Sequence, residues 1–329
     1  MMNAIHARWQ RLVDRASEPR FLIGASLFRI VSGLTILHLY LANYHQRHYL
    51  YGPLGVWPFA RSLAEAQGGS FSVYLWSRAP LYFEIVYHLG ILCAVLFIIG
   101  WRTRLMTLLT YVFLWSMHQR NPALLDGGDN IIRIMLVYGI FAELGAHFSL
   151  DAERLRAERE RGEAVPRIKM MMHGAAMLAI AIQICLVYGV AGLYKVQGEM
   201  WQNGTALYYI TRVGEFAWPG HSEHIYHDVA LVTGATYATV AFQLAFPFMF
   251  FLNRHTRRIA LASAFLFHAG IAVVMGLVTF AAFAMSVELA LISDTEYRAV
   301  TAWSRRLLRR GAAWIGRRSA GAPPIIEGG

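Results

Sequence analysis

The sequence predicts an all-α membrane protein with about eight transmembrane segments. Of its 329 residues, 57% are apolar and only 15% are charged, and the apolar residues gather in long runs. One run, residues 170–194, is 25 residues long. As a helix rising ~1.5 Å per residue it can cross a hydrocarbon core of about 30 Å. This composition is typical of polytopic membrane proteins and excludes an ordinary soluble domain.

The apolar runs define the expected helices in order. The first begins at Phe21 without a small-residue cleavage pattern, so we interpret it as a retained span and not as a signal peptide. The expected spans are 21–42, 80–100, 105–117, 130–147, 170–194 and 229–252. A tract at 259–292 follows, and a break at Met275-Gly276-Leu277 would divide it into spans 259–275 and 278–292. The alternative is six spans plus a re-entrant hairpin.

The distribution of cations predicts that both termini are cytoplasmic. Of the 30 lysines and arginines, 22 lie in segments on one side of the expected spans, and only six lie in the opposite loops. Cytoplasmic loops carry the excess of positive charge in membrane proteins. The net charge of +10 therefore reflects topology, and we expect no nucleic-acid partner. The lipid bilayer is the expected partner.

The chain divides into a basic arm at 1–20, a transmembrane domain at 21–292 and a basic tail at 293–329. The arm and residues 301–318 mix arginines with apolar residues at near-helical spacing. Each is either an interfacial helix on the cytoplasmic leaflet or a solvated tail. Residues 153–167 are expected to form a solvated helical hairpin. The two cysteines, Cys93 and Cys185, lie in apolar runs and are expected to be packing residues.

The outward loops at 43–79, 117–130 and 195–228 are long and aromatic, which favours a binding role over disorder. Lys195 opens the last of these loops. One interpretation is that its side chain extends to the lipid headgroups. The other is that a partly desolvated Lys195 acts as a base or nucleophile. Three histidines follow at a spacing of three, but no zinc signature is present and we expect no metal site.

Two acidic residues, Asp126 and Asp129, flank a pair of glycines before the 130–147 span. In one interpretation Asp129 or Asn130 caps the helix, and Arg133, one turn on, pairs with Asp129. In the other, Asp129 points into an outward-facing cavity and handles protons. The sequence alone leaves both open.

Ionisable residues within the spans are expected to face the interior of the bundle because charge is costly in hydrocarbon. Glu84 and His88 share one helix face, and Glu84 is expected to reach Arg133. Arg29 and Glu288 are expected to pair. A further ionisable residue, His268, precedes the expected break in the 259–292 tract and is a candidate functional residue.

Seven motifs in order resemble the HTTM (horizontally transferred transmembrane) family, which includes the vitamin K-dependent gamma-carboxylases. They are Phe28-Arg-Ile-Val-Ser-Gly33, Tyr51-Gly-Pro-Leu-Gly-Val56, Gly128-Asp-Asn130, Ser149-Leu-Asp151, Ala191-Gly-Leu-Tyr-Lys195 with Trp201 and Gly204, Phe246-Pro247, and His268 with Gly276 and Phe280. The resemblance implies that Lys195 matches the lysine regarded as the base that deprotonates vitamin K hydroquinone. Tyr194 stands where the animal enzyme has another lysine, and Asp129 aligns with a histidine there.

The chain ends about 37 residues after Ile292, whereas the carboxylases continue into a large lumenal domain. Peptidyl-glutamate carboxylation is therefore not expected. Short bacterial members of this size also resemble the SdpB-like proteins, which are associated with maturation of an exported antimicrobial peptide. This resemblance rests on analogy and chain size. It implies a bacterial inner-membrane protein with an extracytoplasmic site.

Two functions remain open from these observations. In the first, an outward cavity uses Lys195 as general base on a membrane-dissolved quinol or an exported peptide, with Asp129 and His268 as further catalytic residues. The expected binding residues are Tyr51, Glu84, His88, Arg133, Tyr194, Trp201 and Gly204. The only cofactor considered is a quinone or hydroquinone. In the second, the protein is a non-catalytic maturation, export or immunity partner of an exported peptide, and its aromatic loops form the docking surface.

Overall fold

A computed structural model describes residues 14, 17–66, 68–161, 164–214, 220 and 222–320, and no strand occurs among them. Every expected membrane segment contains a helix. These helices are α2 (Leu22–Ala42), α5 (Pro80–Ile99), α6 (Thr103–Arg120), α7 (Gly127–Phe141), α9 (Ala164–Gln197), α13 (Val229–Leu252), α14 (Arg254–Met275) and α15 (Val278–Ala290). The all-α prediction is confirmed for the described residues.

The connections contain shorter elements. The connections after α2, α6 and α9 contain α3 (Arg47–Tyr51), α4 (Phe59–Ala66), η1 (Val73–Leu75), η2 (Pro122–Leu124), α10 (Glu199–Gln202), α11 (Ala206–Ile210) and α12 (Ser222–Tyr226). Helix α8 (Ala152–Glu160) follows α7, and α16 (Asp294–Ala320) follows α15. The described parts of the three aromatic loops therefore contain short helices.

Five of the described helices are long and apolar enough to cross a membrane: α2, α5, most of α9, α13 and α14. A sixth crossing is counted only if α15 and the start of α16 are taken together, although they are bent by 100°. Helix α7 has 15 residues, about 22 Å of rise, which is shorter than the hydrocarbon core. The chain is a multi-pass membrane protein. By length and composition its described helices support five or six crossings, and the expected eight are not confirmed.

The expected break in the last apolar tract is present. Helix α14 ends at Met275, and Gly276 follows with a φ of 66°, a left-handed conformation that glycine adopts without steric cost. Helix α15 starts two residues later, at Val278, and packs back against α14. The two halves of the tract are therefore separate helices.

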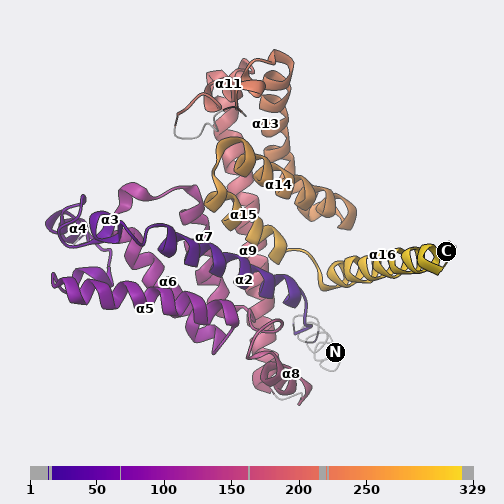
Figure 1. Cartoon of the computed structure of the whole chain (residues 1–329), viewed down its shortest axis with the longest axis horizontal. Coiled ribbons are helices and arrows are strands. Elements are labelled where there is room, and N and C mark those ends of the chain that lie inside the picture. Colours follow the sequence, from indigo (N-terminus) through magenta and orange to yellow (C-terminus); the bar gives the residue numbers. More distant parts are fainter. Residues whose placement is uncertain are drawn as a thin grey trace, which may run out of the picture.

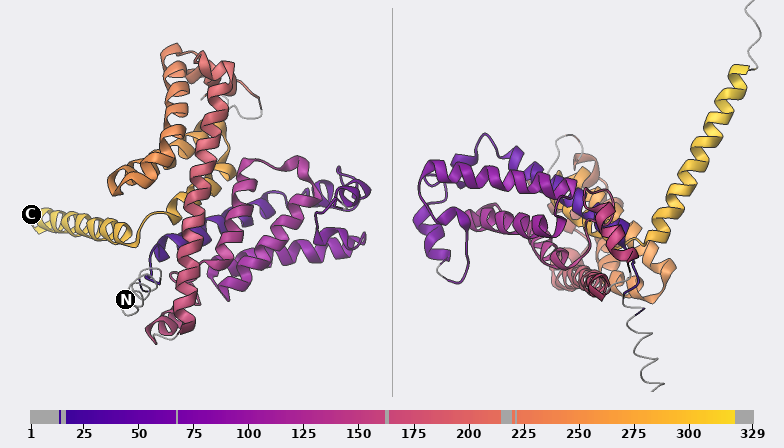
Figure 2. Two further views of the ribbon diagram at one scale, coloured as in Figure 1. Left: turned by 180° about the vertical axis from the view of Figure 1, so that it is seen from behind. Right: turned by 90° about the horizontal axis from the view of Figure 1, so that it is seen from below.

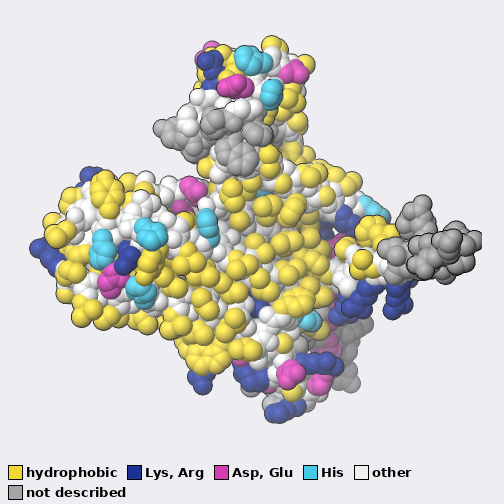
Figure 3. Space-filling view, viewed as in Figure 1, with side chains coloured by type: hydrophobic (Ala, Val, Ile, Leu, Met, Phe, Trp, Pro, Cys, Tyr) yellow, Lys and Arg dark blue, Asp and Glu magenta, His cyan; other side chains and the backbone are white. Residues whose placement is uncertain are grey.

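Helices α2, α5 and α6 lie side by side, and α9 runs past one end of this group with α13 packed along it (Figures 1 and 2). Helix α15 contacts α2, α7 and α14, so it joins the two groups. The face seen in Figure 3 has a broad apolar surface, with charged and histidine side chains gathered near its ends. The helix α16 projects away from the bundle and presents an exposed apolar stripe, Val300, Trp303 and Leu307.

Arg29 does not pair with Glu288, so this sequence-based prediction is wrong. Its guanidinium is fully buried and donates to five backbone carbonyls: those of Phe97, Ile98, Leu144, His147 and Phe148. Two of these carbonyls end α5, where helical partners run out. Arg29 therefore ties the end of α5 to the connection between α7 and α8.

The basic connector at 153–167 forms the helix α8 and the start of α9, as expected for a helical hairpin. Lys169 Nζ lies 2.7 Å from Glu158 Oε2 and joins the two helices. The hydrogen bond from Lys169 holds the pKa of Glu158 below its ordinary value. Cys93 and Cys185 are free and buried, which confirms their packing role. Most of the 1–20 arm lies outside the described residues.

Candidate functional site

A cavity of about 720 Å³ lies between α7, α9, α11, α13, α14 and α15. Its lining is mostly apolar, and few polar groups reach it: Asn130, Gln183, Tyr188, Lys195, Thr211, Thr239, Gln243 and His268. Cavities of this size, apolar with a few convergent polar groups, are typical of small-molecule sites. This cavity is the candidate functional site.

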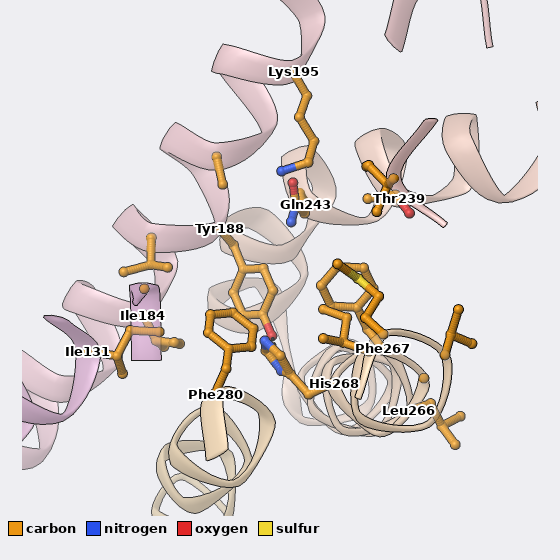
Figure 4. A pocket seen from close by; sticks show the side chains of 18 of the residues that line it. Ile131, Ile184, Tyr188, Lys195, Thr239, Gln243, Leu266, Phe267, His268 and Phe280 are labelled. Carbon is orange, nitrogen blue, oxygen red and sulfur yellow. Dashed lines mark hydrogen bonds between the residues drawn. The ribbon is translucent and has the colours of Figure 1, made fainter. Parts of the chain in front are cut away.

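Lys195 and His268, two of the three expected catalytic residues, line this one cavity. Lys195 lies in the last turn of α9, and His268 lies on α14. Figure 4 shows the Lys195 side chain extending into the cavity toward Gln243. The structure therefore brings together two residues that are 73 positions apart in the sequence.

The ammonium of Lys195 forms no ion pair with a carboxylate among the residues that the structure describes. Its nitrogen lies 5.0 Å from the centroid of the Trp201 ring, a cation–π contact. Trp201, an expected binding residue, also lines the cavity. The Oε1 atom of Gln243 is buried without a hydrogen-bond partner in the described part of the chain. A ligand group could satisfy both polar side chains.

The inner end of the cavity contains a buried hydrogen-bond network. Tyr188 Oη donates to Glu288 Oε1 at 2.8 Å, and His268 Nδ1 lies 2.7 Å from the same oxygen. Tyr188 Oη is also 3.2 Å from His268 Nδ1. All three residues are at most 5% exposed. This network, and not Arg29, holds the Glu288 carboxylate within the membrane domain.

Asp129, the third expected catalytic residue, does not line the cavity. It occupies the third position of α7 and completes a capping box with Asp126, whose backbone N–H donates to Asp129 Oδ2 at 3.0 Å. Its other oxygen lies 3.3 Å from His118 Nε2. Burial and the charge of Asp129 raise the pKa of Asp126 above its ordinary value. The N-cap is therefore Asp126 and not the expected Asp129 or Asn130, and Asp129 takes part in capping from the third helical position.

Two expected ionic contacts are wrong. Arg133 forms no ion pair with Asp129, and its guanidinium donates to Asn130 Oδ1 and lies over the Trp115 ring. Glu84 does not reach Arg133 either. Its carboxylate accepts a hydrogen bond from Arg47 at 2.9 Å, because α3 folds back over the start of α5.

The remaining expected binding residues lie outside the cavity. His88 Nε2 is 3.0 Å from Tyr44 Oη, and its Nδ1 lies 3.3 Å from Glu84 Oε2. Tyr51, the last residue of α3, is buried in the core, whereas Tyr194 is 72% exposed and does not line the cavity. Gly204 has a φ of 76° and approaches Thr233 closely, which explains a glycine at this turn. Their binding roles are not supported by a shared site.

Tyr188 and Gln243 were not singled out from the sequence. A signal for Tyr188 was present, because it precedes Lys195 by seven residues and so shares its helix face. Gln243 is a polar side chain in the apolar 229–252 run, which should have marked it as facing the bundle interior. Among the described residues no group of three or more metal-binding side chains occurs, and His221 lies outside them.

The chain is similar to two proteins of Bacillus subtilis (strain 168). It is 26% identical to the sporulation-delaying protein SdpB over 191 residues, which cover 56% of this chain and 57% of that relative. It is 23% identical to the uncharacterized protein YitO over 220 residues, 65% of this chain and 68% of that relative. No protein-family model and no solved structure matches. The similarity supports a bacterial, SdpB-like relative, and the match covers just over half of SdpB.

Proposed function

We propose that this protein is a membrane partner in the pathway of an exported peptide, and that its cavity binds an apolar segment of that peptide. Similarity to SdpB supports the pathway. The observation that carries the binding role is the Lys195 ammonium, which lies in a mostly apolar cavity and forms no ion pair with a carboxylate in the described part of the chain. We propose further that the protein lies in the bacterial inner membrane and that the cavity faces the extracytoplasmic side, as the distribution of cations favours.

The ligand chemistry follows from the lining. Aliphatic and aromatic side chains cover most of the cavity and favour apolar residues of a peptide. A single ammonium next to the Trp201 ring favours one carboxylate, because charge-assisted hydrogen bonds are stronger than neutral ones. An apolar segment ending in a free carboxylate satisfies both requirements. Gln243 would donate or accept one further hydrogen bond through its side-chain amide.

The test uses a dansylated apolar hexapeptide as a free acid and as its C-terminal amide, titrated against the protein in nanodiscs. We expect the acid to bind about tenfold or more tightly than the amide, since a hydrogen bond to a charged group contributes ~1.5–3 kcal/mol. In Lys195→Met this difference should vanish, while Lys195→Arg should retain it. Equal binding of acid and amide to the unaltered protein contradicts the proposed ligand chemistry.

A cellular measurement tests the pathway itself. Deletion of the gene should reduce the amount of a mature secreted peptide, measured by mass spectrometry of the culture medium. Complementation with the unaltered gene should restore the peptide, and Lys195→Met should not. An unchanged set of secreted peptides after deletion would argue against the pathway, whatever the binding experiment shows.

A second candidate function is general-base chemistry on a membrane-dissolved hydroquinone. The observation in its favour is that Lys195 and the buried Tyr188–His268–Glu288 network share one apolar cavity. The Nζ of a neutral Lys195 would accept a hydroxyl proton, and the oxygen left behind would carry the negative charge. Anaerobic titration with a reduced naphthoquinone should then produce the absorbance of the phenolate, and Lys195→Met should abolish it.

The variant Tyr188→Phe separates the two functions. It keeps the ring, whose centroid lies 4.2 Å from that of Phe246, but removes the hydroxyl from the network. If the cavity only binds peptide, the acid-to-amide affinity ratio should stay unchanged, because this hydroxyl lies in the buried network and not at the ammonium. If the network handles protons, the phenolate absorbance should fall while the affinity for the hydroquinone stays constant.

A further inference from the structure

A second cavity of about 700 Å³ lies at the opposite end of the bundle, between the start of α6, the connection after α7, α8 and the start of α9. Its charged lining residues are Arg102, Arg104, Glu143, Asp151, Arg154 and Lys169. Four of the six are cations. The cavity therefore has an excess of positive charge at the level where α5 ends and α6 begins.

The two carboxylates of this cavity are already engaged. Asp151 Oδ2 accepts hydrogen bonds from the backbone N–H of Thr103 at 2.6 Å and from its hydroxyl at 2.9 Å. Burial tends to raise the pKa of Asp151, but these bonds hold it below its ordinary value, so the carboxylate stays ionised. Glu143 pairs with Arg104 at 3.0 Å. These contacts fix the cavity walls.

Arg102 is the exception among these cations. It is exposed and forms no ion pair with a carboxylate in the described ranges; its guanidinium lies 5.5 Å from the centroid of the Trp101 ring. Its φ of 43° is left-handed, a conformation that is unfavourable for residues other than glycine. Such strain is typical of positions where the side chain has a function. A glycine would fit the turn but would remove the guanidinium.

The surface beside Arg102 is apolar. Trp101 is 42% exposed, and Leu105 and Leu108 are 44% and 41% exposed on successive turns of α6. A phosphate placed at Arg102 and Arg104 would therefore have an acyl-chain path along the same helix. Free phosphate would bind the cations but would make no contact with the exposed leucines of α6. Basic pockets between membrane helices are known to hold anionic lipid headgroups.

We propose that this cavity binds the phosphate of an anionic phospholipid, with Arg102 as the principal ligand and the exposed leucines of α6 in contact with an acyl chain. The carboxylate-paired cations, Arg104, Arg154 and Lys169, set the local potential and offer their remaining N–H groups. The site is independent of the Lys195 cavity. The lipid would anchor the end of the bundle where α5, α6 and α8 meet.

The experiment measures lipid affinity by native mass spectrometry, with dioleoyl phosphatidylglycerol and dioleoyl phosphatidylcholine in mixed micelles. We expect phosphatidylglycerol to bind about tenfold more tightly than phosphatidylcholine, and Arg102→Gly to remove this preference. The glycine relieves the left-handed backbone, so the variant should fold with an unchanged or raised melting temperature. The matched control is Arg156→Gln, which removes the same charge from an exposed position on α8 outside the cavity.

Two results would overturn the proposal. One is an unchanged preference for phosphatidylglycerol in a folded Arg102→Gly protein. The other is complete displacement of the lipid by inorganic phosphate at millimolar concentration, which would identify a site for a soluble anion. Retention of the preference in Arg156→Gln, together with its loss in Arg102→Gly, supports the assignment to this cavity.

Discussion

Arg29 offers the sharpest test of the fold, because the sequence and the structure assign it different partners. Arg29→Met removes every donor to the five backbone carbonyls that the guanidinium holds. Each buried acceptor left without a partner costs ~1–3 kcal/mol, and removal of one side of a buried charged network typically costs ~3–5 kcal/mol. We expect a loss of about 3–5 kcal/mol in the free energy of unfolding.

The pairing expected from the sequence is tested by a double-mutant cycle with Glu288→Gln. Since Glu288 accepts from Tyr188 and His268, its substitution and that of Arg29 should be additive within ~0.5 kcal/mol. Arg29→Lys, which retains three donors in place of five, should lose less stability than Arg29→Met. The assay is equilibrium unfolding in mixed micelles, followed by circular dichroism.

A loss below ~1 kcal/mol in Arg29→Met would refute the importance of the carbonyl contacts, because it is less than the lower estimate for a buried charged network. A coupling energy above ~1 kcal/mol between positions 29 and 288 would instead support the ion pair that the sequence predicted.

Three further predictions concern other parts of the molecule. Gly192→Ala should lower the melting temperature, at a cost of ~1–3 kcal/mol, because a Cβ there would lie 2.9 Å from a leucine side chain of α13. The lowered pKa of Glu158 stabilises the folded state at pH values above the ordinary carboxyl pKa, and this stability should be lost as the pH falls through the folded-state pKa. The melting temperature, measured against pH, should therefore fall less on acidification in Glu158→Gln than in the unaltered protein. Spin labels at Trp303 should be in contact with lipid and those at Arg306 in water if α16 is interfacial, whereas equal oxygen accessibility would contradict this placement.

The positions of the helices could be predicted from the sequence because long apolar runs have few alternatives in a membrane. Each of the eight expected segments contains a helix, and the break at Gly276 is where glycine interrupts the run. The number of crossings was harder to predict. A 15-residue helix such as α7 is long enough to pack between other helices without spanning the hydrocarbon core.

The candidate site was only partly predictable. Lys195 and His268 could be predicted because an ionisable side chain in or at the end of a membrane span is energetically costly and often marks a functional site. Which ionisable groups meet depends on how helices pack, and periodicity does not specify that. In the structure Arg29 donates to backbone carbonyls, and Glu84 accepts from Arg47. Asp129 takes part in the capping of α7. Neutral Tyr188 and Gln243 gave weaker signals, although both line the cavity.

The two cavities differ in ways that match different ligands. The Lys195 cavity is lined mostly by apolar side chains, so the one ammonium there interacts strongly with a single acidic group. The Arg102 cavity is lined by several charges and Arg102 itself is exposed, so its cations are screened by salt and depend on multiple contacts. Binding at the Lys195 cavity should accordingly change little between low and high salt. Phosphatidylglycerol binding at the Arg102 cavity should weaken as salt increases, and this contrast distinguishes the sites without any substitution.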